Sequence, residues 1–347
     1  MKKPLATALA ILVAVFALLF SKSEALLEGV MTRRIDQTLS RVDESWLTDG
    51  KLHVFLCGTA AALPDADRAG PCTAVLAGGE FILIDAGPAS WRNLDLANLP
   101  VGRLSAILVT HFHSDHIGEL GEAITQSWIA GRAKPLDVFG PPGVEEVVEG
   151  FQAAYAHDVG YRVAHHLPEF MPAEGAQANP HSLPLPAGDE AVPVFERNGV
   201  KVGAFRVEHE PANPALGYRV EYAGRVVVIS GDTRKTASVI ANARGVDLLV
   251  HEALAFHMTD RASARAKELG KTRMAKLAAD VRTYHTSPVE VAAIAQAAGV
   301  KKLVITHVFP PLPNVIARSL FMRGTGDIFD GPIVLGRDGQ HFELDPQ

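Results

Sequence analysis

The feature that most constrains this chain is a cluster of ionisable side chains directly behind an apolar strand. The run LSAILVTH, residues 104–111, has the composition of a buried strand, and a helical pattern, IGELGEAITQSW, begins near Ile117. The short stretch that joins them brings four possible metal ligands to one point: His111, His113, Asp115 and His116. The chain therefore has to fold so that this strand ends at a polar site.

Four later apolar runs end in residues of the same kind. VGAFRVEH ends in His209, RVVVISGD in Asp232, VDLLVHE in His251 and Glu252, and KKLVITH in His307. Side chains at the ends of successive strands gather along one edge of a layered α/β structure, where such folds usually keep their sites. A lone histidine beside a strand is usually structural, but H-x-H-x-D-H followed by three more strand-end ligands indicates metal binding.

The ligand types restrict the metal. Imidazole and carboxylate without thiolate favour Zn²⁺, with Mn²⁺ or Fe²⁺ also compatible. The candidates exceed the four ligands of one tetrahedral zinc, so we expect two ions, with Asp232 as the bridge and a hydroxide between the ions as the nucleophile. The seven candidates are His111, His113, Asp115, His116, His209, Asp232 and His307.

The N-terminus has the pattern of an export signal. Lys2 and Lys3 precede the apolar run of residues 5–20, which is somewhat shorter than the roughly 20 residues that a helix needs to cross a bilayer. This segment is either cleaved or kept as a membrane anchor. Both alternatives place the folded part outside the cytoplasm, in the periplasm or on a membrane. The expected organisation is a signal peptide or anchor at 1–25, a helical lead-in at 26–50 and a hydrolase domain at 51–347.

Two cysteines stand at the ends of two expected strands. Cys57 closes LHVFLC and Cys72 opens CTAVLAG, with a short loop between them. In an oxidising compartment a disulfide there would add roughly 3 kcal/mol for a loop of this size. Two unpaired, semi-buried thiols are an equal alternative.

The overall charge is mildly acidic. A net charge of −6 gives no strong basic field of the kind that a dedicated nucleic-acid binder carries. One local stretch is basic, and a solvated helix face is favoured there over a contact with a polyanion. Its members are Arg261, Arg265, Lys267, Lys271, Arg273, Lys276 and Arg282.

Several motifs resemble the metallo-β-lactamase superfamily, and within it the ribonuclease Z branch and its exported relatives of arylsulfatase type. They are THFHSDHIG at 110–118, the strand-end His209, SGDT at 230–233 and ITHV at 305–308, with support from LIDAG at 83–87. The resemblance runs from about Leu52 to the C-terminus and implies an α/β fold, the αββα four-layer sandwich. It assigns one metal to His111, His113, His209 and Asp232, and the second to Asp115, His116, Asp232 and His307.

The same resemblance implies catalytic roles for Asp115 and for His285, which lies near it. His285 matches the histidine that assists the leaving group in the ribonuclease Z branch. His285 also stands just before SPVE, residues 287–290, which predicts a helix start with a capping box. A general acid is the favoured role and a surface histidine near a cap is the alternative. His251 and Glu252 are expected to orient the metal ligands.

Two segments depart from ribonuclease Z. GPASWRN, residues 87–93, replaces a glycine-rich segment, and VFPPLP after His307 replaces a serine and arginine pair. With the charge and the export pattern, these departures favour an exported dinuclear zinc hydrolase that cleaves a small phosphodiester or aryl sulfate. A ribonuclease Z-type tRNA 3′ endonuclease and a lactonase or β-lactamase-like enzyme are the alternatives, and a non-enzymatic binder is disfavoured because no ligand position is lost. Nucleic acid is not expected as a partner, and membrane attachment and a homodimer are left open.

Overall fold

The chain divides into two compact units. The computed structural model describes residues 16, 20, 23–24, 26–37 and 42–347, and it separates Met1–Asp43 from Glu44–Gln347. Residues 26–37 of the first unit are helical. The expected signal or anchor at 1–25 lies almost entirely outside the described residues. Among the helices that are described, none has both the length and the apolar character needed to cross a membrane.

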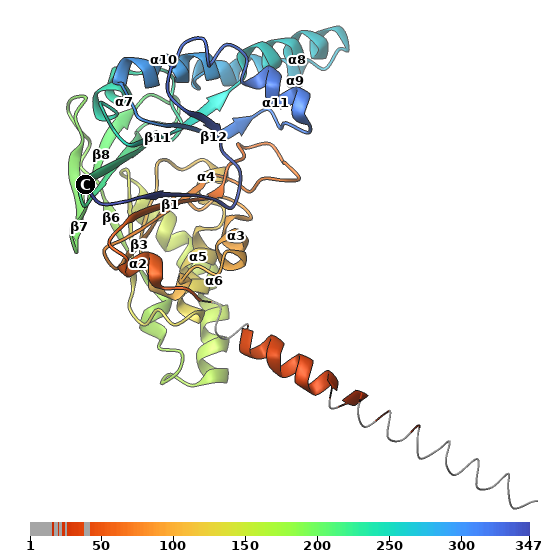
Figure 1. Ribbon diagram of the computed structural model, residues 1–347, viewed down its shortest axis with the longest axis vertical. Coiled ribbons are helices and arrows are strands. Elements are labelled where there is room, and N and C mark those ends of the chain that lie inside the picture. The colour runs from red at the N-terminus through yellow and green to blue at the C-terminus, as the bar shows by residue number, and fades with distance from the viewer. Residues whose placement is uncertain (1–15, 17–19, 21–22, 25, 38–41) are drawn as a thin grey trace, which may run out of the picture. The chain divides into compact units, whose positions relative to one another are not determined.

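The second unit is built on two seven-stranded mixed sheets (Figure 1). The first sheet has the order β14-β1-β2-β3-β4-β5-β6, with parallel pairing from β3 to β6. Its strands are β1 (Leu52–Gly58), β2 (Cys72–Ala77), β3 (Glu80–Ile84), β4 (Leu104–Leu108), β5 (Leu136–Gly140), β6 (Ala178–Ser182) and β14 (Gln340–Leu344).

The second sheet has the order β13-β12-β11-β10-β9-β8-β7, with parallel pairing from β10 to β13. Its strands are β7 (Val192–Arg197), β8 (Val200–Val207), β9 (Ala215–Tyr222), β10 (Arg225–Ile229), β11 (Leu248–Leu254), β12 (Leu303–Phe309) and β13 (Ile333–Leu335). Because β10, β11 and β12 run in one direction, the residues that follow them or close them meet at one edge of the sheet.

Helices cover the outer face of each sheet. A core that includes Leu94, Ile124 and Val148 joins α3 (Ser90–Leu96), α5 (Leu120–Ile129) and α6 (Val144–His166) to the first sheet. A matching core joins α7 (Ala237–Asn242), α10 (Pro288–Ala298) and α11 (Val315–Phe321) to the second. Apolar side chains from both sheets fill the space between them. The remaining helical segments are α2 (Ser45–Thr48), η1 (Val101–Arg103), α4 (Ser114–Ile117), η2 (Ala173–Ala176), α8 (Phe256–Glu268), α9 (Thr272–Asp280) and η3 (Val281–Thr283).

This arrangement confirms the predicted αββα sandwich. Strands β1, β2 and β3 are buried on both faces, which explains their continuous apolar sequences. The predicted capping box is also present, since Ser287 Oγ accepts from the Glu290 N–H and Glu290 accepts from the Ser287 N–H. The helix that it starts, α10, ends at Gly299 with φ of 64°, a conformation that glycine adopts without penalty.

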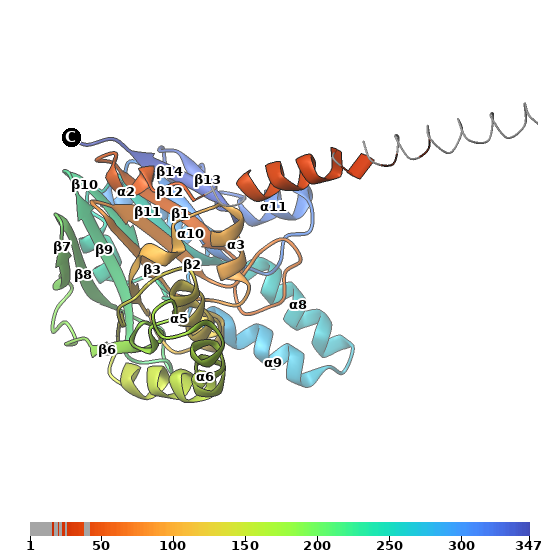
Figure 2. The ribbon, with the colours of Figure 1, turned by 90° about the horizontal axis from the view of Figure 1, so that it is seen from below.

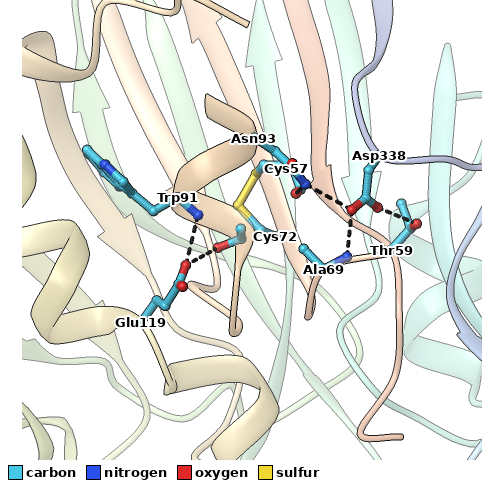
Figure 3. Close-up of a disulfide and its surroundings, with 9 residues drawn as sticks. Cys57, Thr59, Ala69, Cys72, Trp91, Asn93, Glu119 and Asp338 are labelled. Carbon is cyan, nitrogen blue, oxygen red and sulfur yellow. Dashed lines mark hydrogen bonds between the residues drawn. A yellow bond between two sulfur atoms is a disulfide. The ribbon is translucent and has the colours of Figure 1, made fainter. Parts of the chain in front are cut away.

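Cys57 and Cys72 form a disulfide between the end of β1 and the start of β2 (Figure 3). It closes a loop that contacts Asp338, which lies just before β14; Asn93 of α3 contacts the same carboxylate. The Asp338 carboxylate accepts from Thr59 Oγ1, the Ala69 N–H and Asn93 Nδ2, at 2.7, 2.6 and 2.9 Å. The loop is therefore held covalently at its ends and by hydrogen bonds along its length.

We predict that the double substitution Cys57→Ala with Cys72→Ala lowers the free energy of unfolding by about 3 kcal/mol, because the open loop has more entropy in the unfolded chain. Urea unfolding of the oxidised protein and of the variant measures the difference. The wild type unfolded with excess dithiothreitol is the matched control and should behave as the variant does. Equal midpoints for all three samples would mean that the disulfide contributes nothing.

Candidate metal centre

Four of the predicted ligands form one group at the edge between the two sheets. They are His111 after β4, His113 in the following turn, His209 after β8 and Asp232 after β10. One ligand atom from each lies within 4.8 Å of all the others. His113 Nδ1 is 2.9 Å from His111 Nε2 and 3.2 Å from His209 Nε2. These are the residues that the resemblance assigned to the first metal.

A second group lies beside the first. Ligand atoms of Asp115, His116 and His307 also fall within 4.8 Å of one another. Asp115 and His116 come from the single turn of α4, and His307 comes from β12. The structure thus brings all seven predicted ligands together, while their assignment to particular metals stays a prediction.

Asp232 touches both groups. Its Oδ2 lies 3.9 Å from His111 Nε2 and 3.7 Å from His209 Nε2 on one side. On the other side it lies 3.3 Å from His116 Nε2 and 3.2 Å from His307 Nε2. A carboxylate in this position is placed to contact two cations at once.

The donor set fits divalent cations. Asp232, His111 and His116 are almost fully buried, at 3%, 1% and 1% exposure. Within the part of the chain that the structure describes, His116 Nε2 and Asp232 Oδ1 have no hydrogen-bond partner, which costs about 1–3 kcal/mol each if nothing binds there. Both cysteines are in the disulfide, so the donors are nitrogen and oxygen only. Zinc, manganese and iron are all compatible with such a site.

The protonation states of three ligands also suit a metal. Burial lowers the pKa of His111 well below its usual value and that of His209 to about 4, so both rings are neutral and have a free electron pair. Burial opposes the charge on Asp232, but the neighbouring His307 and His116 hold the pKa of this carboxyl well below its usual value. Neutral imidazoles and an ionised carboxylate are the forms that bind cations. His116 differs, because burial disfavours its imidazolium but Asp232 and Asp85 outweigh this effect and raise its pKa well above the usual value, so a cation would displace a proton from this ring.

The backbone is constrained where the ligands leave their strands. Gly231, just before Asp232, has φ of 61°, and a Cβ there would lie 2.6 Å from the Leu216 carbonyl oxygen. Only glycine avoids that contact. His307 itself has φ of 46°, a conformation that is rare outside glycine and that surrounding structure has to impose.

Asp85 is a site residue that the sequence analysis did not identify as functional. It follows β3 in LIDAG, and its Oδ2 lies 2.7 Å from His116 Nδ1. Asp85 also accepts from the Thr110 N–H and from Thr110 Oγ1, both at 2.8 Å. Since a carboxylate accepts the Nδ1 proton, Nε2 of His116 is the nitrogen that faces Asp232. The available signal was the position of Asp85 at a strand end on the same edge as the ligands.

The backbone of Tyr284 fixes the ring orientation of another ligand, His209. The Tyr284 carbonyl oxygen is 2.8 Å from His209 Nδ1. A carbonyl accepts only, so Nδ1 carries the proton and Nε2 is directed at the metal group. The sequence held no sign of this contact, because it joins two residues far apart in the chain.

His285 is buried against the candidate centre. Its ring centre lies 5.0 Å from that of His209 and 5.5 Å from that of His307. Its Nδ1 is 3.2 Å from Glu252 Oε1, and the same oxygen accepts from the Thr286 N–H at 2.9 Å. Burial disfavours the imidazolium, yet Glu252 and Asp232 outweigh it and raise the pKa of His285. A histidine whose protonated form is favoured therefore lies beside the ligands.

The two residues expected to orient ligands differ in their contacts. Glu252 reaches His285 and ties it to β11. His251 Nδ1 lies 2.7 Å from the Glu252 carbonyl oxygen, and the described residues give its Nε2 no partner. Their roles remain predictions.

Comparison with known proteins places the chain in a family. Residues 80–308 match the family model described as the beta-lactamase superfamily domain. The chain belongs to the beta-lactamase superfamily. It is 35% identical over 301 residues to a protein named ribonuclease Z from Mycobacterium bovis, which covers 85% of this chain and 99% of that protein. A ribonuclease Z from Mycobacterium sp. strain KMS is 37% identical over 298 residues, covering 85% of this chain and 97% of that one.

Solved structures agree on the fold. The short form of human tRNase Z has a TM-score of 0.60 and 21% identity, and the metallo-beta-lactamase fold protein YhfI of Bacillus subtilis has a TM-score of 0.60 and 18% identity. Each comparison covers 84% of this chain and 99% of the other. The predicted superfamily and the likeness to ribonuclease Z are confirmed, and the protein is a metal-dependent hydrolase of this superfamily.

Two expectations are corrected. The prediction of an exported, periplasmic or membrane-anchored protein is wrong. The relatives that match 85% of the chain are enzymes named ribonuclease Z. An apolar run of 16 residues behind two lysines is too weak a pattern to outweigh that match. The expectation that nucleic acid is not a partner conflicts with the same relatives, and no finding supports the aryl sulfate part of the functional prediction.

We predict that Asp85→Asn lowers the affinity of the site for Zn²⁺ about 10- to 100-fold, because His116 loses the carboxylate that orients it. Chelator competition measures the affinity. Asp137→Asn is the matched control, since Asp137 Oδ1 lies 2.9 Å from His181 Nε2 in a similar pair away from the site. If both variants bind zinc as the wild type does, Asp85 does not support the metal.

Proposed function

We propose that the protein is a two-metal phosphodiesterase that cleaves RNA, as a ribonuclease Z-type endonuclease. The observation that carries this proposal is the 35% identity to ribonuclease Z along 99% of that enzyme's length. The clustered ligands support it, because no ligand position of the resemblance is missing. A small phosphodiester is a second candidate, favoured by the two segments that depart from ribonuclease Z.

The residues would hold the metals as follows. His111, His113 and His209 would bind the first cation, and Asp115, His116 and His307 the second, with Asp232 shared between them. When bound, two such cations act as Lewis acids on a phosphoryl group and lower the pKa of bound water. Asp85 and the Tyr284 carbonyl fix the ring orientations of His116 and His209 before any substrate arrives.

His285 is proposed as the proton donor. Cleavage of RNA releases a ribose alkoxide, which is a poor leaving group without a proton. Glu252 faces Nδ1 of His285 and favours the protonated ring, which leaves Nε2 to donate toward the leaving oxygen. Glu252 is thus a positioning residue that acts through His285.

One departure from ribonuclease Z has a defined structure. GPASWRN forms the start of α3, and Glu119 accepts from the Ala89 N–H group at 2.6 Å and from the Trp91 N–H group at 2.8 Å. The contact between Glu119 and Trp91 is drawn in Figure 3. The Gly87 backbone packs against the Asp115 carbonyl oxygen, so this helix borders α4 and its ligands. A rigid helix in place of a glycine-rich segment would change which substrates fit.

We predict that the zinc-loaded protein cleaves a 3′-extended tRNA transcript at one position, and that Asp232→Ala and excess EDTA each abolish cleavage. Gel analysis of end-labelled RNA measures the reaction, with bis(p-nitrophenyl) phosphate and p-nitrophenyl sulfate tested beside it. If bis(p-nitrophenyl) phosphate is hydrolysed but the RNA is not cleaved, a small phosphodiester is favoured as the substrate instead. Turnover of neither phosphodiester would contradict the proposed function.

We predict that His285→Ala lowers kcat on RNA about 100- to 10,000-fold, the usual contribution of a general acid. Hydrolysis of bis(p-nitrophenyl) phosphate should fall much less, because a nitrophenolate leaves without a proton. His181→Ala, at a partly exposed histidine of β6, is the matched control. An equal loss on both substrates would show that His285 only shapes the site.

A further inference from the structure

The helices α8 and α9 form a hairpin that projects from the body of the domain (Figure 2). Ser263 Oγ donates to the Ala275 carbonyl oxygen at 2.7 Å and joins the two helices. At the base, Arg282 Nη1 donates to Asp260 Oδ2 at 2.6 Å, and its guanidinium lies 4.9 Å from the centre of the Phe256 ring. The hairpin is therefore a defined arm of the fold.

Both ends of this arm are attached to the candidate centre. α8 begins four residues after Glu252, and η3, which follows α9, ends two residues before His285. Glu252 and His285 face each other at 3.2 Å. Since α8 has 13 residues at about 1.5 Å each, the tip of the arm stands roughly 20 Å from its base.

The arm is the basic part of an acidic chain. Residues 256–283 contain seven Lys and Arg residues against three Asp and Glu residues, whereas the whole chain has a net charge of −6. Arg265, Lys276 and Arg282 pair with the three acids of the arm. The four other cations are exposed and have no salt bridge to any described residue: Arg261, Lys267, Lys271 and Arg273.

Three of these unpaired cations crowd the tip. Lys267 lies in the last turn of α8, Lys271 is the residue before α9, and Arg273 lies in the first turn of α9. No acidic residue occupies that first turn, where negative charge would stabilise the helix. Lys267 is favourable at the C-terminal end of α8, whereas Lys271 and Arg273 are unfavourable at the start of α9. Together the three cations concentrate positive potential at the tip.

We propose that the tip of the α8–α9 arm, defined by Lys267, Lys271 and Arg273, binds the phosphate backbone of an RNA substrate whose scissile bond lies at the candidate metal centre. The inference rests on the proposed function. A small diester at the centre cannot also reach a tip roughly 20 Å away, so the arm selects for a polyanion long enough to touch both places. Exposed lysines and arginines are the residues that contact phosphates without reading sequence.

The test compares the triple variant Lys267→Gln, Lys271→Gln, Arg273→Gln with a control that removes the same charge elsewhere. The control is Lys134→Gln, Lys201→Gln, Arg244→Gln, three exposed positions near the starts of β5, β8 and β11, at the edge away from the ligands. KM and kcat are measured on the 3′-extended tRNA transcript and on bis(p-nitrophenyl) phosphate, and the Kd for the transcript is measured by fluorescence anisotropy in 50–300 mM salt.

The tip variant is expected to raise KM and Kd for the transcript about tenfold or more, with the diester reaction and kcat unchanged. The slope of log affinity against log salt should become shallower by about two, as expected when three phosphate contacts are lost. The control should behave as the wild type does in every assay.

Unchanged Kd and salt slope in the tip variant would overturn the arm proposal even if RNA is cleaved. If RNA binds through the tip but is not cleaved, the proposed function is wrong, while the assignment of RNA binding to the tip still holds. The arm also exposes Leu269, Met274 and Leu277, at 56%, 64% and 54%. If their replacement by serine dissociates an oligomer while the tip variant binds RNA normally, the arm is a self-association surface and the proposal is wrong.

Discussion

A buried carboxylate surrounded by imidazoles is the interaction on which the rest of the site depends. Asp232 is 3% exposed and has four histidine nitrogens within 3.9 Å of one oxygen. An isolated charge at such depth would cost several kcal/mol. His111 and His116 lie in the segment that follows β4 of the first sheet, whereas His209 follows β8 and His307 lies in β12 of the second. The carboxylate is therefore stabilised only when both sheets are in place. The apolar layer between the sheets therefore sets the distances in the site.

Much of this site could be predicted because it follows from strand direction. Each ligand closes or follows an apolar run, and the ends of such runs meet at one edge whatever the details of the loops. The capping box before α10 was predictable for a similar reason, since it depends on four consecutive residues. The family pattern then supplied an assignment to metals that spacing alone did not contain.

The features that the sequence could not predict depend on contacts between residues far apart in the chain or on the redox state of the compartment. The role of Asp85 appears only when β3 and α4 are brought together, and the Tyr284 carbonyl carries no signal in the sequence at all. Whether Cys57 and Cys72 form a disulfide could not be predicted, because two cysteines at strand ends are compatible with a bridge and with free thiols. The export prediction was wrong because the composition of a short N-terminal segment is shared by segments with other roles.

The position of β14 has a consequence for how the protein is made. This last strand pairs with the first, so that Leu52 lies opposite Leu344, and Asp338 holds the loop after β1. During synthesis β1 can pair with β2 at once, yet its other edge stays open until β14 has left the ribosome. An unpaired strand edge is a template for wrong partners. The edge of β1 is therefore open to aggregation while all the intervening strands are made, and loss of β14 would leave that edge permanently open.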